Sequence, residues 1–233
     1  MAARKTKTPR KKPQQARAQT TVNAILEGTV QVLEREGPEA ATTTRIAEVA
    51  GVSVGTLYQY FSHRDAVLDA LQEREFDRAL AFVTGVLSDG NLAQTPRQTV
   101  TAAVEGMSAF YIQNPGLHRV LAMEGLRSSK ADRLQSFDLR VIALIRHFLA
   151  ATGAPVRRKN VEAAAFVTFQ CVRATMLATL LERPAGLNSQ SLADELVDLL
   201  LRYLVDDAWL SRTEKATRRS VDAKRAAIRP GKT

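Results

Sequence analysis

The stretch that decides the fold is TTTRIAEVAGVSVGTLYQYFSHRDAVL, residues 42–68. It starts with a threonine cluster, in which a hydroxyl can accept a free backbone N–H of the first turn of a helix that runs to Ala50. Gly51 permits the positive φ that a sharp connection between two helices needs. A further short helix begins at Ser53 and ends near Tyr60. The stretch therefore predicts a helix-turn-helix.

The two short helices divide their side chains between a buried and an exposed face. The spacing buries the apolar or small side chains of Ile46, Ala47, Val52, Leu57 and Phe61. The exposed face of the second helix then carries Ser53, Val54, Gly55, Thr56, Tyr58, Gln59 and Tyr60. A glycine lets the backbone approach DNA, a threonine can contact a thymine methyl or a phosphate, and tyrosine hydroxyls can reach phosphates. This face is suited to a DNA major groove.

Residues 19–70 resemble the DNA-binding domain of the tetracycline-repressor (TetR) family. The resemblance is carried by Thr42 and Thr44, Ile46-Ala47, Ala50-Gly51-Val52-Ser53, Gly55-Thr56-Leu57-Tyr58, Tyr60-Phe61 and Leu68. Arg64 stands where the family usually has lysine, which keeps the charge for a phosphate contact but changes its geometry. The resemblance implies a three-helix DNA-binding head with the helix-turn-helix, residues 19–65, and a helical ligand-binding and dimerisation domain, residues 66–211.

The resemblance also implies a homodimer that binds a pseudo-palindromic double-stranded operator and acts as a repressor, released by a small ligand. The predicted DNA contacts are Thr42, Thr43, Thr44, Arg45, Ser53, Val54, Gly55, Thr56, Tyr58, Gln59, Tyr60, His63 and Arg64. The predicted ligand contacts are large apolar or soft side chains, which favour an apolar or aromatic effector: Phe82, Met107, Phe110, Tyr111, Met123, Phe166, Phe169 and Met176.

Helical periodicity continues on both sides of this stretch, and no long run of alternating β-branched residues predicts a sheet. The expected fold is all-α with about nine helices. A first helix presents Val22, Ile25, Leu26, Val30 and Leu33 on one face and stops at Gly37-Pro38; a fourth is capped by Ser62 and extends toward Asp89-Gly90. Thr95-Pro96-Arg97-Gln98 is a capping box for a helix that reaches Asn114, and later helices are predicted at 117–126, 130–151, 157–182 and 189–210.

The resemblance implies that the last two of these helices pair with their counterparts in a second subunit as a four-helix bundle. Leu192, Leu196, Leu199, Tyr203 and Leu204 form one stripe, and Ala164, Ala165, Thr168, Val172 and Thr175 offer small or slender side chains for close approach. Packing inside one subunit explains both stripes equally well, so periodicity leaves the choice open.

Positive charge is concentrated at the two ends of the chain. The net charge is +9, from 33 Lys and Arg against 24 Asp and Glu. Residues 1–18 hold seven basic residues and no acid, residues 212–233 hold eight against two acids, and residues 19–211 hold 18 against 22. A uniformly basic nucleic-acid binder is therefore excluded. Both basic tails are expected to be disordered, and they either add sequence-independent DNA affinity or only keep the protein soluble.

Other function classes have weaker support. Gly51-Val52-Ser53-Val54-Gly55 fits the G-x-S-x-G pattern of α/β-hydrolases, but a helix precedes it where that fold needs a strand, so we do not expect an enzyme. The three histidines are dispersed and Cys171 is the only cysteine, so we expect no metal site and no cofactor. No run approaches the roughly 18 apolar residues of a membrane span, and we expect a cytoplasmic protein. A helical module that binds DNA without sequence preference remains the alternative.

Overall fold

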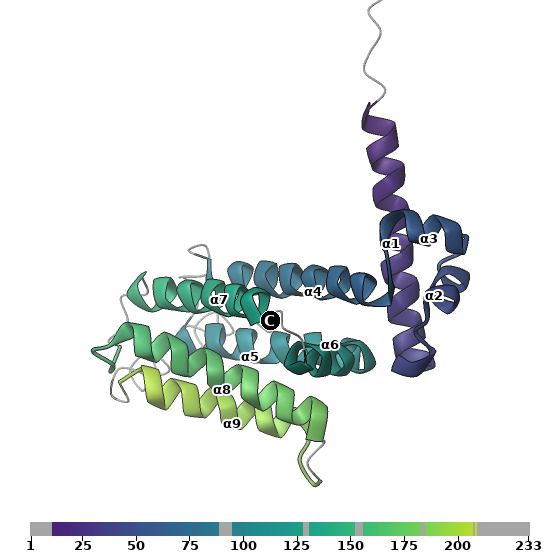
Figure 1. Ribbon diagram of the computed structural model, residues 1–233. Helices are drawn as coiled ribbons and strands as arrows, with labels where there is room; N and C mark the ends of the chain where they lie inside the picture. Colours follow the sequence, from purple (N-terminus) through teal and green to yellow (C-terminus); the bar gives the residue numbers. More distant parts are fainter. Residues whose placement is uncertain are drawn as a thin grey trace, which may run out of the picture. The chain divides into compact units, whose positions relative to one another are not determined.

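The computed structural model describes residues 11–88, 95–127, 131–151, 156–182, 185–206 and residue 208 (Figure 1). Within these residues the only regular elements are helices, which confirms the predicted all-α fold. They are α1 (Lys11–Arg35), the short 3-10 turn η1 (Pro38–Ala40), α2 (Thr43–Val49), α3 (Val54–Tyr60), α4 (Arg64–Leu87), α5 (Pro96–Gln113), α6 (Pro115–Arg127), α7 (Ala131–Ala151), α8 (Val161–Glu182) and α9 (Ser189–Leu204).

Helix α1 begins earlier than predicted. It starts at Lys11, so the expected disorder up to residue 18 is wrong for Lys11–Ala18. Pro13 does not prevent this, because a proline in the first turn removes only an N–H that has no partner inside the helix. Residues 1–10 and the predicted tail at 212–233 lie outside the described residues.

Two helices near the C-terminus are shorter than predicted. Helix α8 starts at Val161 rather than 157, and α9 ends at Leu204 rather than 210. Val205, where α9 was expected to continue, pairs instead with Val156 as an isolated antiparallel bridge. The N–H of Arg157 donates to the carbonyl of Leu204 at 2.9 Å, which satisfies a backbone group at the end of α9.

The chain divides into two compact units, Met1–Glu75 with Asn114–Leu126, and Phe76–Gln113 with Arg127–Thr233. We call them the N-terminal unit and the C-terminal unit. The division falls inside α4 and places α6 with the N-terminal unit, so it differs from the expected boundary after residue 65. A sequence boundary drawn at the end of the helix-turn-helix could not include α6, which begins about 50 residues later, at Pro115.

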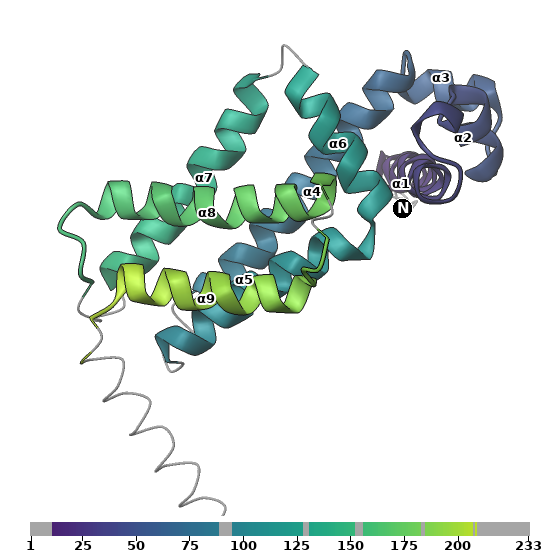
Figure 2. The ribbon, with the colours of Figure 1, turned by 90° about the horizontal axis from the view of Figure 1, so that it is seen from below.

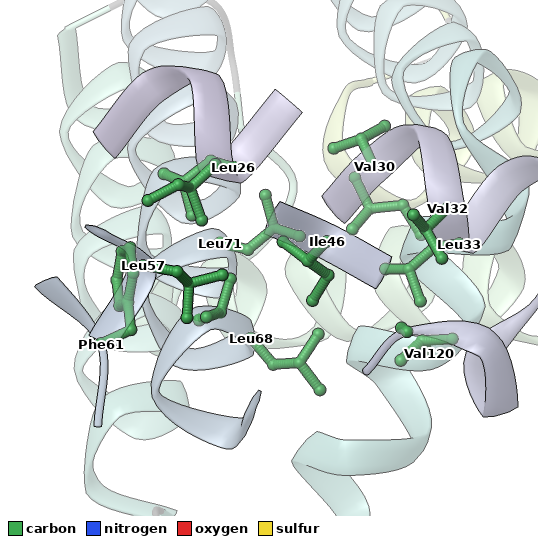
Figure 3. Packing of buried hydrophobic residues seen from close by; sticks show 14 of the residues in the cluster. Leu26, Val30, Val32, Leu33, Ile46, Leu57, Phe61, Leu68, Leu71 and Val120 are labelled. Atoms are coloured by element: carbon green, nitrogen blue, oxygen red, sulfur yellow. The ribbon is translucent and has the colours of Figure 1, made fainter. Parts of the chain in front are cut away.

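The N-terminal unit has a continuous apolar core, shown in Figure 3. Its fully buried members come from every helix of the unit and include Ile25, Val32, Ile46, Leu57, Val67, Leu71 and Leu117. Helix α6 is fixed to α1 at its first turn, because the N–H of Leu117 donates to Glu34 Oε1 at 2.7 Å. Burial of these side chains orders the helix-turn-helix on α1, and each large one contributes about 1.5–3 kcal/mol.

The C-terminal unit is built on α5, α7, α8 and α9, with α8 packed against the other three (Figure 2). Its core includes Val104, Leu149, Ala164, Ala165, Met176, Leu196, Leu200 and Leu201. The predicted capping box opens α5: the N–H of Thr95 donates to Gln98 Oε1 at 2.8 Å, and the N–H of Gln98 to Thr95 Oγ1 at 3.3 Å. Among the described helices, α8 alone is long and apolar enough to cross a membrane by length and composition. An apolar core helix of a globular protein has the same composition.

Candidate nucleic-acid interface

The helix-turn-helix has the local structure that its sequence predicts. Thr42 caps α2 by accepting the N–H of Arg45 at 3.2 Å, and Ser53 caps α3 by accepting the N–H of Thr56 at 3.0 Å. Gly51 joins the two helices with φ +68°. The buried side chains are also as expected, with Ile46, Ala47 and Leu57 fully buried, Phe61 nearly so and Val52 packed partly against the core. The geometry of α3 is therefore fixed by its own caps and core.

Gly28 of α1 allows the helix-turn-helix to pack closely against α1. A Cβ at position 28 would lie 2.9 Å from the backbone nitrogen of Ala50, closer than real Cβ contacts allow. The glycine therefore lets α1 touch the backbone at the end of α2 directly. This close approach fixes the turn that precedes α3.

Hydroxyl groups line the exposed surface of α2 and α3. The Oγ1 of Thr43 lies 3.2 Å from the hydroxyl of Tyr58, which links the two helices, and the Oγ atoms of Ser53 and Thr56 are 2.8 Å apart. The Tyr58 side chain is 53% exposed although its hydroxyl is held. Gln59 and Tyr60 are also exposed. Such groups can donate to phosphates and accept from base edges, and their positions are set before DNA binds.

Gly55 is the position on this surface that the fold itself does not explain. A Cβ there would meet only Ser53 Oγ, at 3.8 Å, and the residue does not have a positive φ. Glycine weakens a helix by roughly 0.5–1 kcal/mol relative to alanine, so its presence in the first turn of α3 costs stability. A second molecule that approaches the backbone closely would account for it.

Arg45 was predicted to contact DNA, and it is engaged within the protein. Its Nη2 lies 2.8 Å from Glu36 Oε1, its Nε 2.9 Å from Glu36 Oε2, and its Nη1 2.8 Å from Glu48 Oε2. The hydrogen bonds from Arg45 lower the pKa of the Glu36 carboxyl, and the two carboxylates raise the pKa of the guanidinium. A phosphate contact by Arg45 would require it to leave these partners.

Arg64 is likewise committed to the fold. Its Nε donates to the carbonyl of Ala41 at 2.9 Å and its Nη2 to the carbonyl of Pro38 at 3.2 Å, which ties the start of α4 to the segment before α2. The adjacent His63 caps α4, since its Nδ1 accepts the N–H of Ala66 at 3.1 Å. The predicted cap Ser62 is therefore wrong by one residue. With Nδ1 as acceptor, the exposed Nε2 carries the proton and can still donate to a phosphate.

Two of the remaining predicted DNA contacts differ in exposure. Thr44 is exposed on α2, whereas Val54 packs partly against the core. The hydroxyl of Ser53, the serine of the G-x-S-x-G pattern, is the helix cap described above and follows a helix. The pattern here is a helix-turn-helix connection and lacks the strand that a nucleophile elbow requires.

The structure does not bring all of the predicted ligand contacts together. Seven of them lie in the C-terminal unit on α4, α5 and α8: Phe82, Met107, Phe110, Tyr111, Phe166, Phe169 and Met176. Met123 belongs to the N-terminal unit and is 42% exposed, and Phe166 is 51% exposed on α8. Phe82 packs on Gly106, where a Cβ would collide with its ring, and Phe110 contacts the Tyr111 ring edge-on.

A polar cluster in the same unit was missed by the sequence reasoning. Arg173 Nη1 pairs with Asp138 Oδ2 at 3.0 Å, and Arg173 Nη2 donates to Gln170 Oε1 at 2.9 Å. Asp138 Oδ1 is buried and has no hydrogen-bond partner among the described residues. Burial raises the pKa of Asp138 and of Tyr111, while the charge of Arg173 opposes both shifts. These side chains come from three helices, so no local sequence signal could have grouped them.

Comparison with protein families gives two matches that agree with this architecture. Residues 25–71 match a family described as bacterial regulatory proteins, tetR family, and residues 95–204 match a family described as tetracyclin repressor-like, C-terminal domain. This chain belongs to the TetR family of regulatory proteins. The predicted family is thus confirmed, and the first match contains the whole helix-turn-helix.

Curated relatives match part of the chain. Nucleoid occlusion factor SlmA of Actinobacillus pleuropneumoniae (serotype 5b, strain L20) is 32% identical over 103 residues, 44% of this chain and 50% of that protein. The HTH-type transcriptional repressor KstR of Mycolicibacterium smegmatis is 33% identical over 91 residues, 39% of this chain and 43% of that protein. This chain thus spans half or less of the length of these relatives.

Solved structures of similar fold cover more of the chain. SmeT, the repressor of the Stenotrophomonas maltophilia multidrug efflux pump SmeDEF, is 19% identical with a TM-score of 0.63 and covers 82% of this chain and 93% of its own. The fatty acid degradation regulator FadR of Bacillus halodurans is 19% identical with a TM-score of 0.61, covering 77% and 97%. At this identity the likeness shows the fold alone.

Proposed function

We propose that this protein is a sequence-specific DNA-binding transcription regulator that reads its operator with α3. The observation that carries the proposal is the surface of α2 and α3, where hydroxyls of Thr43, Ser53, Thr56 and Tyr58 are held by hydrogen bonds around Gly55, which the fold does not require. A preorganised polar surface with an exposed glycine backbone is suited to a major groove, because little freedom is lost on binding.

The experiment that tests this proposal selects duplexes from a random-sequence pool with the wild-type protein. The expected result is an enriched pseudo-palindromic sequence, bound more tightly than a scrambled duplex of equal length. Thr56→Ala and Tyr58→Ala should each weaken binding to the selected duplex by about 1–3 kcal/mol. Thr84→Ala is the matched control, because Thr84 is an exposed helical threonine that only bonds its own helix, at the carbonyl of Leu80.

Failure to enrich any sequence would refute sequence-specific regulation. It would favour the alternative of a helical module that binds DNA without sequence preference. If both α3 variants bound the selected duplex as tightly as wild type, α3 would not be part of the DNA interface. The similarity to a nucleoid occlusion factor and to a transcriptional repressor fits DNA binding in either case.

We further propose that the regulator works as a homodimer in the cytoplasm. Helix α8 is evidence for a second subunit, because only 33% of an apolar 18-residue stretch of this helix is buried within one subunit. Its exposed apolar side chains are Phe166, Val167 and Leu181, and α9 adds Leu199. The predicted small residues Ala164, Ala165 and Thr168 are buried within one subunit, so the proposed contact rests on the exposed side chains instead. Two recognition helices of a dimer would reach half-sites about 34–36 Å apart.

We also propose that the protein is a repressor released by a small, largely apolar or aromatic effector in the C-terminal unit. Support comes from the aromatic side chains of α4, α5 and α8 and from the polar cluster beside them. The unpartnered Asp138 Oδ1 accepts hydrogen bonds, so an effector with a hydroxyl or amide N–H would satisfy it. Selection from fragmented genomic DNA would identify the neighbouring genes and thereby the compounds to assay. An effector must lower operator affinity, and by linkage the operator must lower effector affinity equally.

A further inference from the structure

Three of the four arginines in the head that carries the helix-turn-helix are held by partners within the protein. Residues 27–75 contain four arginines, no lysine and nine acidic residues. Arg45 and Arg64 are held by the carboxylates and carbonyls described above. Arg74 lies 2.7 Å from Glu27 Oε1 and 3.3 Å from Glu75 Oε1. Phosphate neutralisation supplies most of the sequence-independent affinity for DNA, so these residues need a basic partner elsewhere.

The N-terminal turns of α1 have the opposite charge. No acidic residue precedes Glu27, and three of the seven Lys and Arg of residues 1–18 lie on α1, namely Lys11, Lys12 and Arg17. Residues 15–20 are exposed except for the half-buried Ala18, and the core of the N-terminal unit begins only at Ile25, with Val22 partly packed against it. The family match also begins at residue 25. The charged turns are therefore a feature of this chain outside the common head.

These turns form a straight extension of a packed helix. Figure 1 shows them running beyond the rest of the three-helix head, with α3 nearer to them than α2 along the direction of α1. The segment from Lys11 to Ile25 is about 21 Å long at 1.5 Å per residue. The B-DNA major groove is about 12 Å wide, so a rigid arm of this length can reach a phosphate strand beyond a groove that α3 occupies.

We propose that residues 11–23 of α1 form a basic helical arm that binds the phosphate backbone of the DNA that α3 reads. The arm supplies sequence-independent, salt-sensitive affinity, while α3 supplies specificity. This inference rests on the proposed function, because it assumes that the protein binds DNA. The roles of the arm and of α3 are nevertheless tested by separate measurements. Arg17, exposed on the arm, and Lys11 and Lys12 at its first turn carry its charge.

The test measures affinity of the full-length protein against salt concentration, on the selected duplex and on a scrambled duplex of the same length. For each subunit bound, Arg17→Ala should reduce the slope of log K against log salt by about 0.9, and the triple variant Lys11→Ala, Lys12→Ala, Arg17→Ala by up to about 2.7. Both duplexes should lose the same slope, so the ratio of their affinities should hold. Lys159→Ala is the matched control, since it removes one exposed positive charge from the C-terminal unit, and its slope should equal that of wild type.

A second pair of variants tests whether the helix matters as well as its charge. Gln19→Pro removes the N–H of residue 19 and its ring clashes with the carbonyl of residue 15, which breaks the arm before the core begins at Ile25. Gln19→Ala removes the same side chain, which bonds only Asn23, and keeps the helix. The proline variant should lose salt-dependent affinity toward the level of the triple variant, and the alanine variant should behave as wild type.

The outcomes separate this inference from the proposed function. Equal salt slopes for wild type and the triple variant would overturn the arm and leave its charge a solubility feature. An unchanged Gln19→Pro slope would overturn the helical arm in favour of a flexible basic tail. A slope that falls on both duplexes without any sequence preference in wild type would support the arm while refuting sequence-specific regulation.

Discussion

Replacing Gly55 with alanine separates the stability of α3 from its approach to DNA. The added Cβ would lie 3.8 Å from Ser53 Oγ, an ordinary van der Waals contact, and the backbone needs no positive φ. Where alanine can adopt the backbone conformation of a glycine, replacing the glycine with alanine stabilises a protein by about 0.4–1 kcal/mol, because the unfolded chain has less conformational freedom to lose. We therefore expect the melting temperature of Gly55→Ala to rise by about 1–4 °C in calorimetry.

The same methyl group should weaken DNA binding. If the first turn of α3 lies against DNA, the methyl occupies the space that glycine leaves, and a lost contact of this kind costs about 1–3 kcal/mol. That corresponds to a loss of roughly 5-fold to 150-fold in affinity for the selected duplex. The assay is a titration at fixed salt and at a temperature where wild type and variant are both folded.

Gly28→Ala is the matched control, with the opposite expectation. Its Cβ would lie 2.9 Å from the nitrogen of Ala50, which is backbone and cannot move aside as a side chain could. Overpacking of this kind costs about 1–3 kcal/mol, so the melting temperature should fall. A stabilised Gly55→Ala that binds the selected duplex as tightly as wild type would refute the close approach of α3 to DNA. A lower melting temperature for Gly55→Ala would refute the claim that there is room for a methyl group at this position.

Three further outcomes test the roles assigned to other side chains. Arg64→Ala removes the side-chain donor from the carbonyl of Ala41 and one of two donors from the carbonyl of Pro38, and it should lower the free energy of unfolding by about 1–3 kcal/mol in urea titration; unchanged stability would contradict the structural role. Phe166→Glu places a charge on the exposed apolar face of α8 and should shift the mass in light scattering from twice 25.6 kDa toward 25.6 kDa, whereas a wild-type monomer would contradict the dimer. The pKa of Glu36 is lowered from 4.5, so its stabilising effect is present above pH 4.5 and disappears as pH falls through the lower folded pKa. The difference in melting temperature between wild type and Glu36→Gln should therefore shrink in acid, and a difference independent of pH would contradict the pairing with Arg45.

The helix-turn-helix was predictable because its signals are local. Thr42, Gly51 and Ser53 act within three residues of themselves, as caps and as a turn, and helical spacing alone selects the buried face. The capping box at Thr95 is of the same kind. Tyr58, Gln59 and Tyr60 are exposed for the same reason, since a helix that buries Leu57 must turn its opposite face outward.

The arginines of the head could not be assigned from the sequence. Arg45 pairs with Glu36, nine residues earlier, and Arg64 donates to carbonyls 23 and 26 residues away. A free arginine and a committed one have the same side chain, and only the path of the chain decides which is which. The family pattern at these positions indicated a charge near DNA, whereas the contacts show charge used to connect helices.

The arm of α1 was missed because composition describes an isolated chain. Residues 1–18 bury almost nothing and repel one another, which predicts disorder for a free peptide. Helix formation has a costly nucleus and cheap elongation, and the packed turns from Val22 to Leu33 already provide the nucleus. Residues 11–18 then extend an existing helix at little cost. Composition overestimates disorder wherever a basic segment adjoins a helix that the core has fixed.

Helix α8 shows why apolar side chains alone do not define a ligand site. Phe166 and Phe169 are one turn apart, yet Phe166 is 51% exposed and Phe169 is 7% exposed, with the guanidinium of Arg173 over its ring at 5.5 Å. The helix is apolar around most of its circumference and packs on α5, α7 and α9, so its own periodicity cannot say which side meets the core. The face of α8 that stays apolar and exposed after these three helices have packed is the one that the proposed dimer would cover. A second subunit on that face would remove Phe166 from the ligand contacts and assign it to the dimer.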